Sequence, residues 1–112
     1  MNAAGLGSRI DLVRGDAESL PLPDGFCSVV CADLLWGEAL GDSKSNAILY
    51  QRFFLEAHCV SRPDSSLIVL TFDKAAMETI EPRINKLFRK QEVRSFLQRG
   101  FQSECTLYSC VK

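Results

Sequence analysis

One acidic residue stands out because it ends the most apolar segment of the chain. Val29 to Ala32 is an apolar run that contains β-branched residues, and Asp33 follows it directly. Such a run predicts a buried strand, and in open α/β sheets ligands bind where the strands end. An aromatic residue and a glycine, Trp36 and Gly37, follow within a few residues. The pattern indicates either a polar group presented to a ligand or a core strand whose last residue meets solvent.

The cysteine and histidine content argues against a metal centre. The chain has five cysteines and one histidine, and no two cysteines have the two-residue gap of a zinc knuckle. The odd number of cysteines, scattered among apolar neighbours, also argues against a disulfide framework and favours a reducing compartment. We therefore expect no metal site, and we expect Cys27 and Cys31 to act as small hydrophobes on one face of a buried strand.

Length and charge limit the classes of function. The chain has 112 residues, of which 46% are hydrophobic, so it can form one domain with a sizeable core. Thirteen basic and 14 acidic residues give a formal net charge of −1, so no overall field attracts nucleic acid or anionic lipid. No apolar run is long enough to span a bilayer, and the N-terminus lacks the order of a signal peptide. We expect a cytoplasmic protein whose contacts with any RNA are local.

Five short segments have the composition of strands. In chain order these segments are 10–13, 28–33, 66–72, 88–97 and 105–111. The third is almost entirely apolar, so we expect both of its faces to be covered. The last two alternate apolar and polar residues around Gly100, which predicts an antiparallel pair exposed on one face.

Two helices are expected between these strands. The first is predicted to begin at Ser45 or Asn46 and to end at 63–64, with its apolar face in the core. That face is formed by residues at three- and four-residue steps: Leu49, Phe53, Ala57 and Val60. The second runs from 75 to about 86 and contains Pro82, so we expect a kink or two short helices. Strands separated by helices imply a parallel α/β sheet, here with an antiparallel hairpin at its end.

The order of the predicted strands and helices, together with several short sequence motifs, resembles that of the class I S-adenosylmethionine-dependent methyltransferases. Segment 15–26 is similar to the segment after the family's third strand, and 56–63 to the helix that leads into its fifth strand. More narrowly, three segments are similar to motifs of the THUMP-domain tRNA guanosine methyltransferases: Asp33-Leu34-Leu35-Trp36-Gly37, the loop to Leu49-Tyr50, and the strand end Leu70-Thr71-Phe72-Asp73. The resemblance implies a Rossmann-like sheet, truncated to the family's strands three to seven, in a partial domain that spans residues 1–112.

The resemblance also implies a set of site residues. Asp33 and a backbone carbonyl of Leu34 or Leu35 would accept hydrogen bonds from the amine that is methylated, and Trp36 would stack on the base. Asp16, the backbone of Ala17, and Asp33 would hold S-adenosylmethionine. Two simpler interpretations stay open, because Trp36 could be a half-buried packing residue and Asp16 an acid in a turn.

The chain departs from the family pattern at several points. Leu35 replaces a usual proline, Cys27 stands where aspartate is common, and Asp64-Ser65 replaces a Gly-Gly turn. Residues 1–112 also carry no counterpart of the family's first two strands or of its glycine-rich cofactor loop. We therefore expect weak cofactor binding, and either self-association through the edge of segment 28–33 or dependence on a missing segment.

Three functions remain in consideration. The first is an N-methyltransferase that acts on guanine in tRNA or another RNA; the family implies a small activator subunit as a further partner. The second is a small-molecule methyltransferase, because segment 15–26 is equally typical of those enzymes. The third is a non-catalytic methyltransferase-fold module that retains the sheet without the cofactor loop. None of them involves a membrane.

Overall fold

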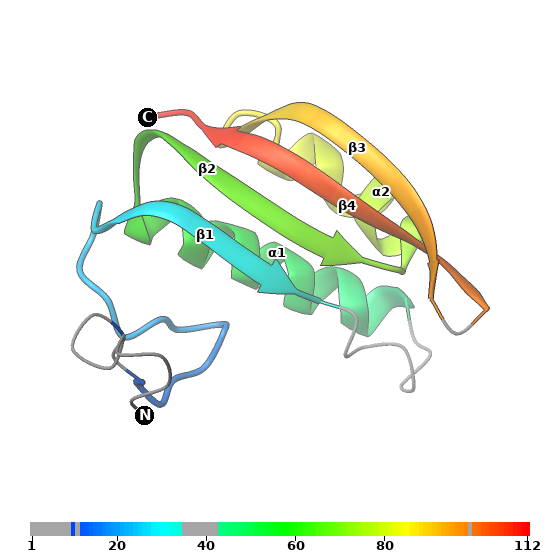
Figure 1. The fold of residues 1–112 in the computed structure, drawn as a ribbon, viewed down its shortest axis with the longest axis horizontal. Coiled ribbons are helices and arrows are strands. Elements are labelled where there is room, and N and C mark those ends of the chain that lie inside the picture. Colours follow the sequence, from blue (N-terminus) through cyan, green and yellow to red (C-terminus); the bar gives the residue numbers. More distant parts are fainter. Residues whose placement is uncertain (1–9, 11, 35–42, 99) are drawn as a thin grey trace.

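The computed structural model describes residues 10, 12–34, 43–98 and 100–112. They form one sheet with two helices packed behind it (Figure 1). The elements, in chain order, are β1 (Cys27–Asp33), α1 (Ser43–Val60), β2 (Ser61–Thr71), α2 (Lys74–Ile84), β3 (Phe88–Gln98) and β4 (Phe101–Cys110). No helix in these ranges is both long and apolar enough to cross a membrane.

The sheet has the mixed topology that the sequence predicts. Its strands lie in the order β1-β2-β4-β3. β1 and β2 are parallel and joined by α1, whereas β4 runs antiparallel to both β2 and β3. The β3–β4 hairpin turns at Gly100, whose φ of 82° lies in the left-handed region that glycine adopts without steric cost. The expected parallel sheet with an antiparallel hairpin is confirmed.

The strand expected at 10–13 is not formed. The described residues of that segment, Ile10, Leu12 and Val13, are irregular and largely exposed. A strand is stable only when its backbone groups pair with a neighbour, and the described sheet pairs β1 with β2 alone. The described sheet therefore has four strands, beginning with the one that ends at Asp33.

Several element boundaries differ from those expected. β2 begins at Ser61, directly after α1, and contains Pro63. The pairing of β1 with β2 shifts between Cys27 and Val29, and Asp64 there has a φ of 62°. Such a bulge removes residues from the ladder, which explains how proline lies within a strand.

The second helix is continuous. α2 contains Pro82 near its end and still runs unbroken to Ile84, so the alternative of two short helices is wrong. A proline in the last turn removes a backbone donor with little helix left after it to disrupt.

The core lies between the helices and one face of the sheet. The ring of Phe54 contacts those of Phe53, Phe88 and Tyr108 edge-to-face, with centroids 5.4 to 5.9 Å apart. Such aromatic contacts bury large areas and favour this geometry. The core side chains therefore come from both helices and from the helix-facing side of β2, β3 and β4.

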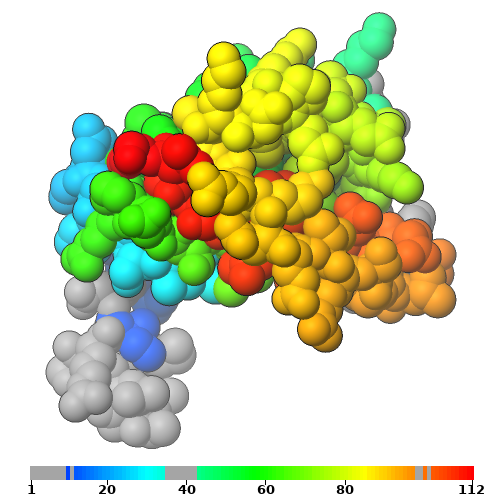
Figure 2. Space-filling view, turned by 90° about the horizontal axis from the view of Figure 1, so that it is seen from above, coloured from blue at the N-terminus to red at the C-terminus, as the bar shows by residue number. Residues whose placement is uncertain are grey.

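The other face of the sheet is not covered by any element that the structure describes. Along β2, buried residues alternate with half-buried ones, so the expectation that both faces are covered is wrong. Cys31 is exposed on this side and Cys27 is half-buried, so the expectation of buried thiols is also wrong. Figure 2, which views the molecule from the β3 edge, shows α2 packed on one side of the hairpin only.

A single carboxylate, that of Asp73, ties the two helices to the end of β2. It accepts hydrogen bonds from the Ala76 N–H at 3.0 Å, from Asn46 Nδ2 at 2.9 Å and from Ser43 Oγ at 3.1 Å. Burial acts to raise the pKa of Asp73, but these hydrogen bonds outweigh it and hold the pKa below its ordinary value. Asp73 thus caps α2 and fixes the first turn of α1.

Replacement of Phe54 tests the core. Phe54 is 0% exposed, so Phe54→Ala should lower the free energy of unfolding by about 3–5 kcal/mol. Leu55, its neighbour on α1, is 46% exposed, so Leu55→Ala should change stability by less than about 0.5 kcal/mol. Urea denaturation followed by circular dichroism measures both, and equal losses would contradict this packing.

The acid dependence of stability tests Asp73. Because its pKa is lowered on folding, its ionised form stabilises the fold above the ordinary pKa of 3.8, and this stability is lost as the pH falls through the lowered value. Asp73→Asn should therefore be less stable than wild type near neutral pH, with a smaller difference below about pH 3. Asp24→Asn removes the same charge from an exposed loop and serves as the control. If the difference in the free energy of unfolding between wild type and Asp73→Asn stays constant from neutral pH to below about pH 3, this role of Asp73 is contradicted.

Candidate functional site

The carboxyl ends of β1 and β2 meet at one edge of the sheet. Asp33 lies opposite Leu70 in the parallel register, and the Leu34 N–H donates to the Leu70 carbonyl at 2.8 Å. The side chain of Asp33 is exposed, whereas Leu34 is 2% exposed and belongs to the core. This alternation follows from the strand period, which sends successive side chains to opposite faces. Asp33 is therefore presented at the edge while Leu34 anchors its backbone.

The carbonyl that follows Asp33 is held by a buried tyrosine. The Tyr50 hydroxyl donates to the Leu34 carbonyl oxygen at 3.3 Å, and Tyr50 is 0% exposed. Burial, reinforced by the negative charge of Asp73, raises the pKa of Tyr50 to about 12. The phenol therefore stays protonated as a donor at neutral pH. A carbonyl oxygen has two lone pairs, so the Leu34 carbonyl can accept a second hydrogen bond.

The residues that flank segment 35–42, Leu34 and Ser43, are both hydrogen-bonded near the carboxyl end of β2. Leu34 is bound to β2 and to Tyr50 on α1, and Ser43 is bound to Asp73 at the end of β2. These contacts hold the two flanks of the segment at the carboxyl edge of the sheet. Leu35 and Trp36 lie outside the described residues, so the predicted stacking role of Trp36 stays a prediction.

Asp16 and Ala17 lie in a different part of the molecule. The Asp16 carboxylate accepts from the Glu18 N–H at 2.9 Å within a turn. The turn is fixed to α1 by a 3.0 Å ion pair between Glu18 and Arg52, and by a 2.8 Å hydrogen bond from the Leu20 N–H to Glu56. These contacts lie along the middle and last part of α1, away from its first turn, which meets the strand ends.

Among the described residues, the two groups of predicted site residues line different hollows. Asp16 and Ala17 line a hollow of about 400 Å³, together with residues of the same irregular segment. Asp33 lines another, of about 300 Å³, on β1 and β2. Among the described residues no cluster of three or more His, Cys, Asp or Glu could hold a metal ion. The described residues therefore offer two separate polar positions.

Tyr50 and the Asp73 cluster were not singled out as site residues by the sequence. The signal for Asp73 was present, because an acid that follows an apolar strand and precedes a helix is a typical N-cap. The role of Tyr50 had no such signal. Tyr50 lies on the core side of α1, and only the packing of α1 on β1 brings its hydroxyl to the Leu34 carbonyl.

Comparison with known proteins supports the resemblance. A family model described as "RMKL-like, methyltransferase domain" matches residues 1–108. The bovine (Bos taurus) tRNA (guanine(6)-N(2))-methyltransferase THUMP3 is 31% identical over 86 residues, which are 76% of this chain and 17% of that protein. The chain therefore spans less than a fifth of the length of this relative.

Solved structures share the fold. TrmN from Thermus thermophilus superimposes with a TM-score of 0.73 and 24% identity, over 97% of this chain and 30% of that one. A putative sarcosine dimethylglycine methyltransferase from Galdieria sulphuraria gives a TM-score of 0.64 at 14% identity, over 98% and 63% of the two chains. The Rossmann-like methyltransferase fold is thereby confirmed, and the chain belongs to the RMKL-like methyltransferase domain family.

Proposed function

We propose that this chain carries the amine-orienting part of an RNA guanine N-methyltransferase. The observation that carries the proposal is the position of Leu34, directly after the exposed Asp33: its carbonyl accepts a hydrogen bond from Tyr50, and its N–H donates to the Leu70 carbonyl of β2. The relation to a tRNA guanine methyltransferase supports guanine in RNA as the substrate class. A small activator subunit, as in the family, is a further proposed partner.

The chemistry asks for two hydrogen-bond acceptors at the target nitrogen. The lone pair of an aryl amine is delocalised into the ring, so its two N–H groups must be held with the lone pair pointing at the methyl group. The Asp33 carboxylate and the Leu34 carbonyl are two such acceptors on neighbouring residues. Because positioning supplies most of the rate, no strong base is needed, and the exposed Asp33 leaves water access for the released proton. Trp36 would stack on the base.

We propose S-adenosylmethionine as the methyl donor on the strength of the family. The described residues do not together form a site for it, because Asp16 and Ala17 line one hollow and Asp33 another. We therefore expect this chain alone to bind the cofactor weakly, so methyl transfer should be measured at high cofactor concentration.

Two other functions are distinguished by simple measurements. A small-molecule methyltransferase would transfer methyl groups without RNA. A non-catalytic module is favoured by the separate hollows and by the open sheet face, and it would show no transfer and no heat on titration with S-adenosylmethionine.

Replacement of Asp33 tests the amine-orienting site. Asp33→Ala should lower transfer of labelled methyl groups to bulk tRNA by about 100-fold, because one acceptor is lost. Asp33→Asn keeps an acceptor oxygen and should lose less. Tyr50→Phe should lie between wild type and Asp33→Ala, since the carbonyl remains but is held less firmly. Asp24→Ala, in the loop before β1, is the matched control.

The outcomes separate the three functions. Full activity of Asp33→Ala would overturn the assignment of the site. No transfer by wild type, with no heat from the cofactor, would favour the non-catalytic module.

We further propose that the chain self-associates through the free edge of β1. In the described sheet β1 pairs only with β2, and Cys27–Asp33 contains neither lysine nor proline to block a second partner. Sedimentation velocity should show a dimer or larger species, and Val29→Lys should shift it toward monomer. Leu55→Lys, at a similarly exposed position on α1, should not. A monomeric wild type at all concentrations would refute this proposal.

A further inference from the structure

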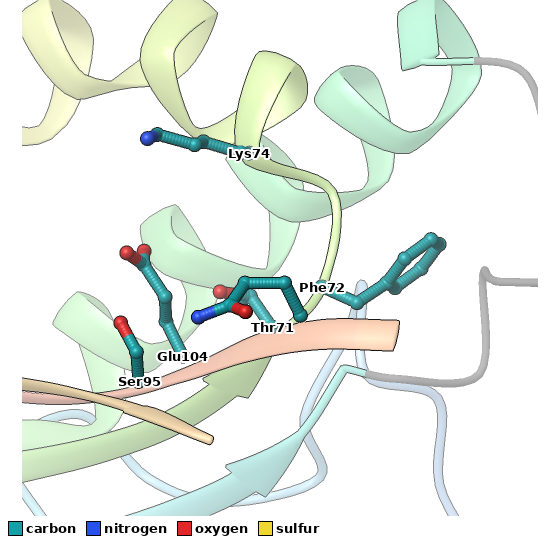
Figure 3. Close-up of a pocket in the computed structure, with 6 residues that line it drawn as sticks. Thr71, Phe72, Lys74, Ser95 and Glu104 are labelled. Atoms are coloured by element: carbon teal, nitrogen blue, oxygen red, sulfur yellow. The ribbon is translucent and has the colours of Figure 1, made fainter. Parts of the chain in front are cut away.

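A polar recess lies between α2 and the β3–β4 hairpin, on the helix-facing side of the sheet. Two cavities, of about 220 and about 140 Å³, share Lys74 and Glu104 in their linings. Figure 3 shows the side chains of Lys74, Ser95 and Glu104 approaching the first cavity from α2, β3 and β4. The Phe72 ring points away from them. We call the two cavities together the α2–hairpin recess; Asp33 and Asp16 line other hollows.

The recess contains a buried hydroxyl without a partner. Tyr108 is 2% exposed and lines the second cavity, and its hydroxyl makes no hydrogen bond within the described part of the chain. Buried polar atoms are almost always hydrogen-bonded, because leaving one unpaired costs the free energy of removing it from water. Glu104 and Tyr108 project from the same side of β4, with Thr106 between them. The hydroxyl thus has hydrogen-bonding capacity that the described residues do not use.

The charges around Tyr108 indicate the sign of that group. Burial raises the pKa of Tyr108, and the carboxylates of Glu81 and Glu104 raise it further, so the phenol is neutral and faces negative charge. Lys90 pairs with Glu81. The other charged side chains in the lining are Lys74, Glu78 and Glu104. One negative charge is therefore left over, so a cation is favoured over an anion.

The size of the recess limits the cation further. The two cavities adjoin along α2, and together they reach only the lower end of the roughly 300–1,000 Å³ of pockets that hold drug-sized ligands. An extended aliphatic chain suits this shape, whereas a nucleotide does not. An ammonium group donates up to three hydrogen bonds, which the phenol oxygen and a carboxylate can accept.

We propose that the α2–hairpin recess binds an aliphatic polyamine, with one ammonium group between Glu104 and Tyr108 and a second near Glu78. The proposal does not depend on methyl transfer, because none of these residues belongs to the candidate site. It assigns a ligand to a recess that combines an excess of negative charge with a buried hydroxyl that has no partner among the described residues.

Isothermal titration calorimetry, with spermidine added to the chain, tests the proposal. Wild type should show saturable binding at one site, and Tyr108→Phe and Glu104→Gln should each weaken it by about tenfold, as expected for the loss of one hydrogen bond to a charged group. Glu92→Gln removes the same charge from an exposed position on β3 outside the recess and should leave the affinity unchanged. Circular dichroism confirms that each variant is folded.

Several results would overturn the proposal. One is the absence of saturable binding, and another is equal weakening by Glu92→Gln, which would indicate non-specific attraction. Spermidine affinity that is unchanged in Tyr108→Phe would show that the hydroxyl does not contact the ligand. Saturable binding of inorganic phosphate at the same residues would assign the recess to anions, held by Lys74 and Lys90.

Discussion

The pairing of β2 on both of its edges is the constraint on which the rest of the structure depends. On one edge it aligns β1 in parallel, which sets Asp33 beside Leu70, and on the other it aligns the terminal hairpin through β4. Its helix-facing side chains are buried by α1 and α2, and the residue cluster at its end begins both helices. Strand pairing, burial of the core and the position of the candidate site therefore all depend on β2.

Features set by local sequence were predicted well, and features set by distant contacts were not. The predicted first helix and the antiparallel hairpin are both formed, with Phe53, Ala57 and Val60 buried as expected. Leu49 is only half-buried, and residues 89–95 of β3 are exposed on both faces, so these two details of the predictions are wrong. Segment 10–13 has the composition of a strand, but strand formation depends on a neighbour that the described sheet does not provide. Pro63 is predicted from sequence to end the preceding helix, but it lies at a bulge within β2, where the register between β1 and β2 leaves residues unpaired.

The candidate site shows the same division. The position of Asp33 at the end of an apolar strand could be inferred from spacing, because strand ends in a parallel sheet share an edge. The hydrogen bond from Tyr50 to the Leu34 carbonyl could not, since it joins residues 16 positions apart across a helix–sheet contact. The proposed cooperation of Asp16 with Asp33 rests on family resemblance, and the described structure places them on separate hollows.

The short connection between β3 and β4 has a consequence for the order of assembly. Two residues separate these strands in the chain, whereas β1 and β2 are joined only through α1. Closing a hairpin takes about 1–10 μs, while a crossover must order a whole helix before its strands meet. We expect the hairpin to bring Phe88 and Tyr108 together early, so that Phe54 packs onto them afterwards. β1 would then be the last strand to join, and its amide hydrogens would be the first in the sheet to exchange with solvent when the native state opens locally.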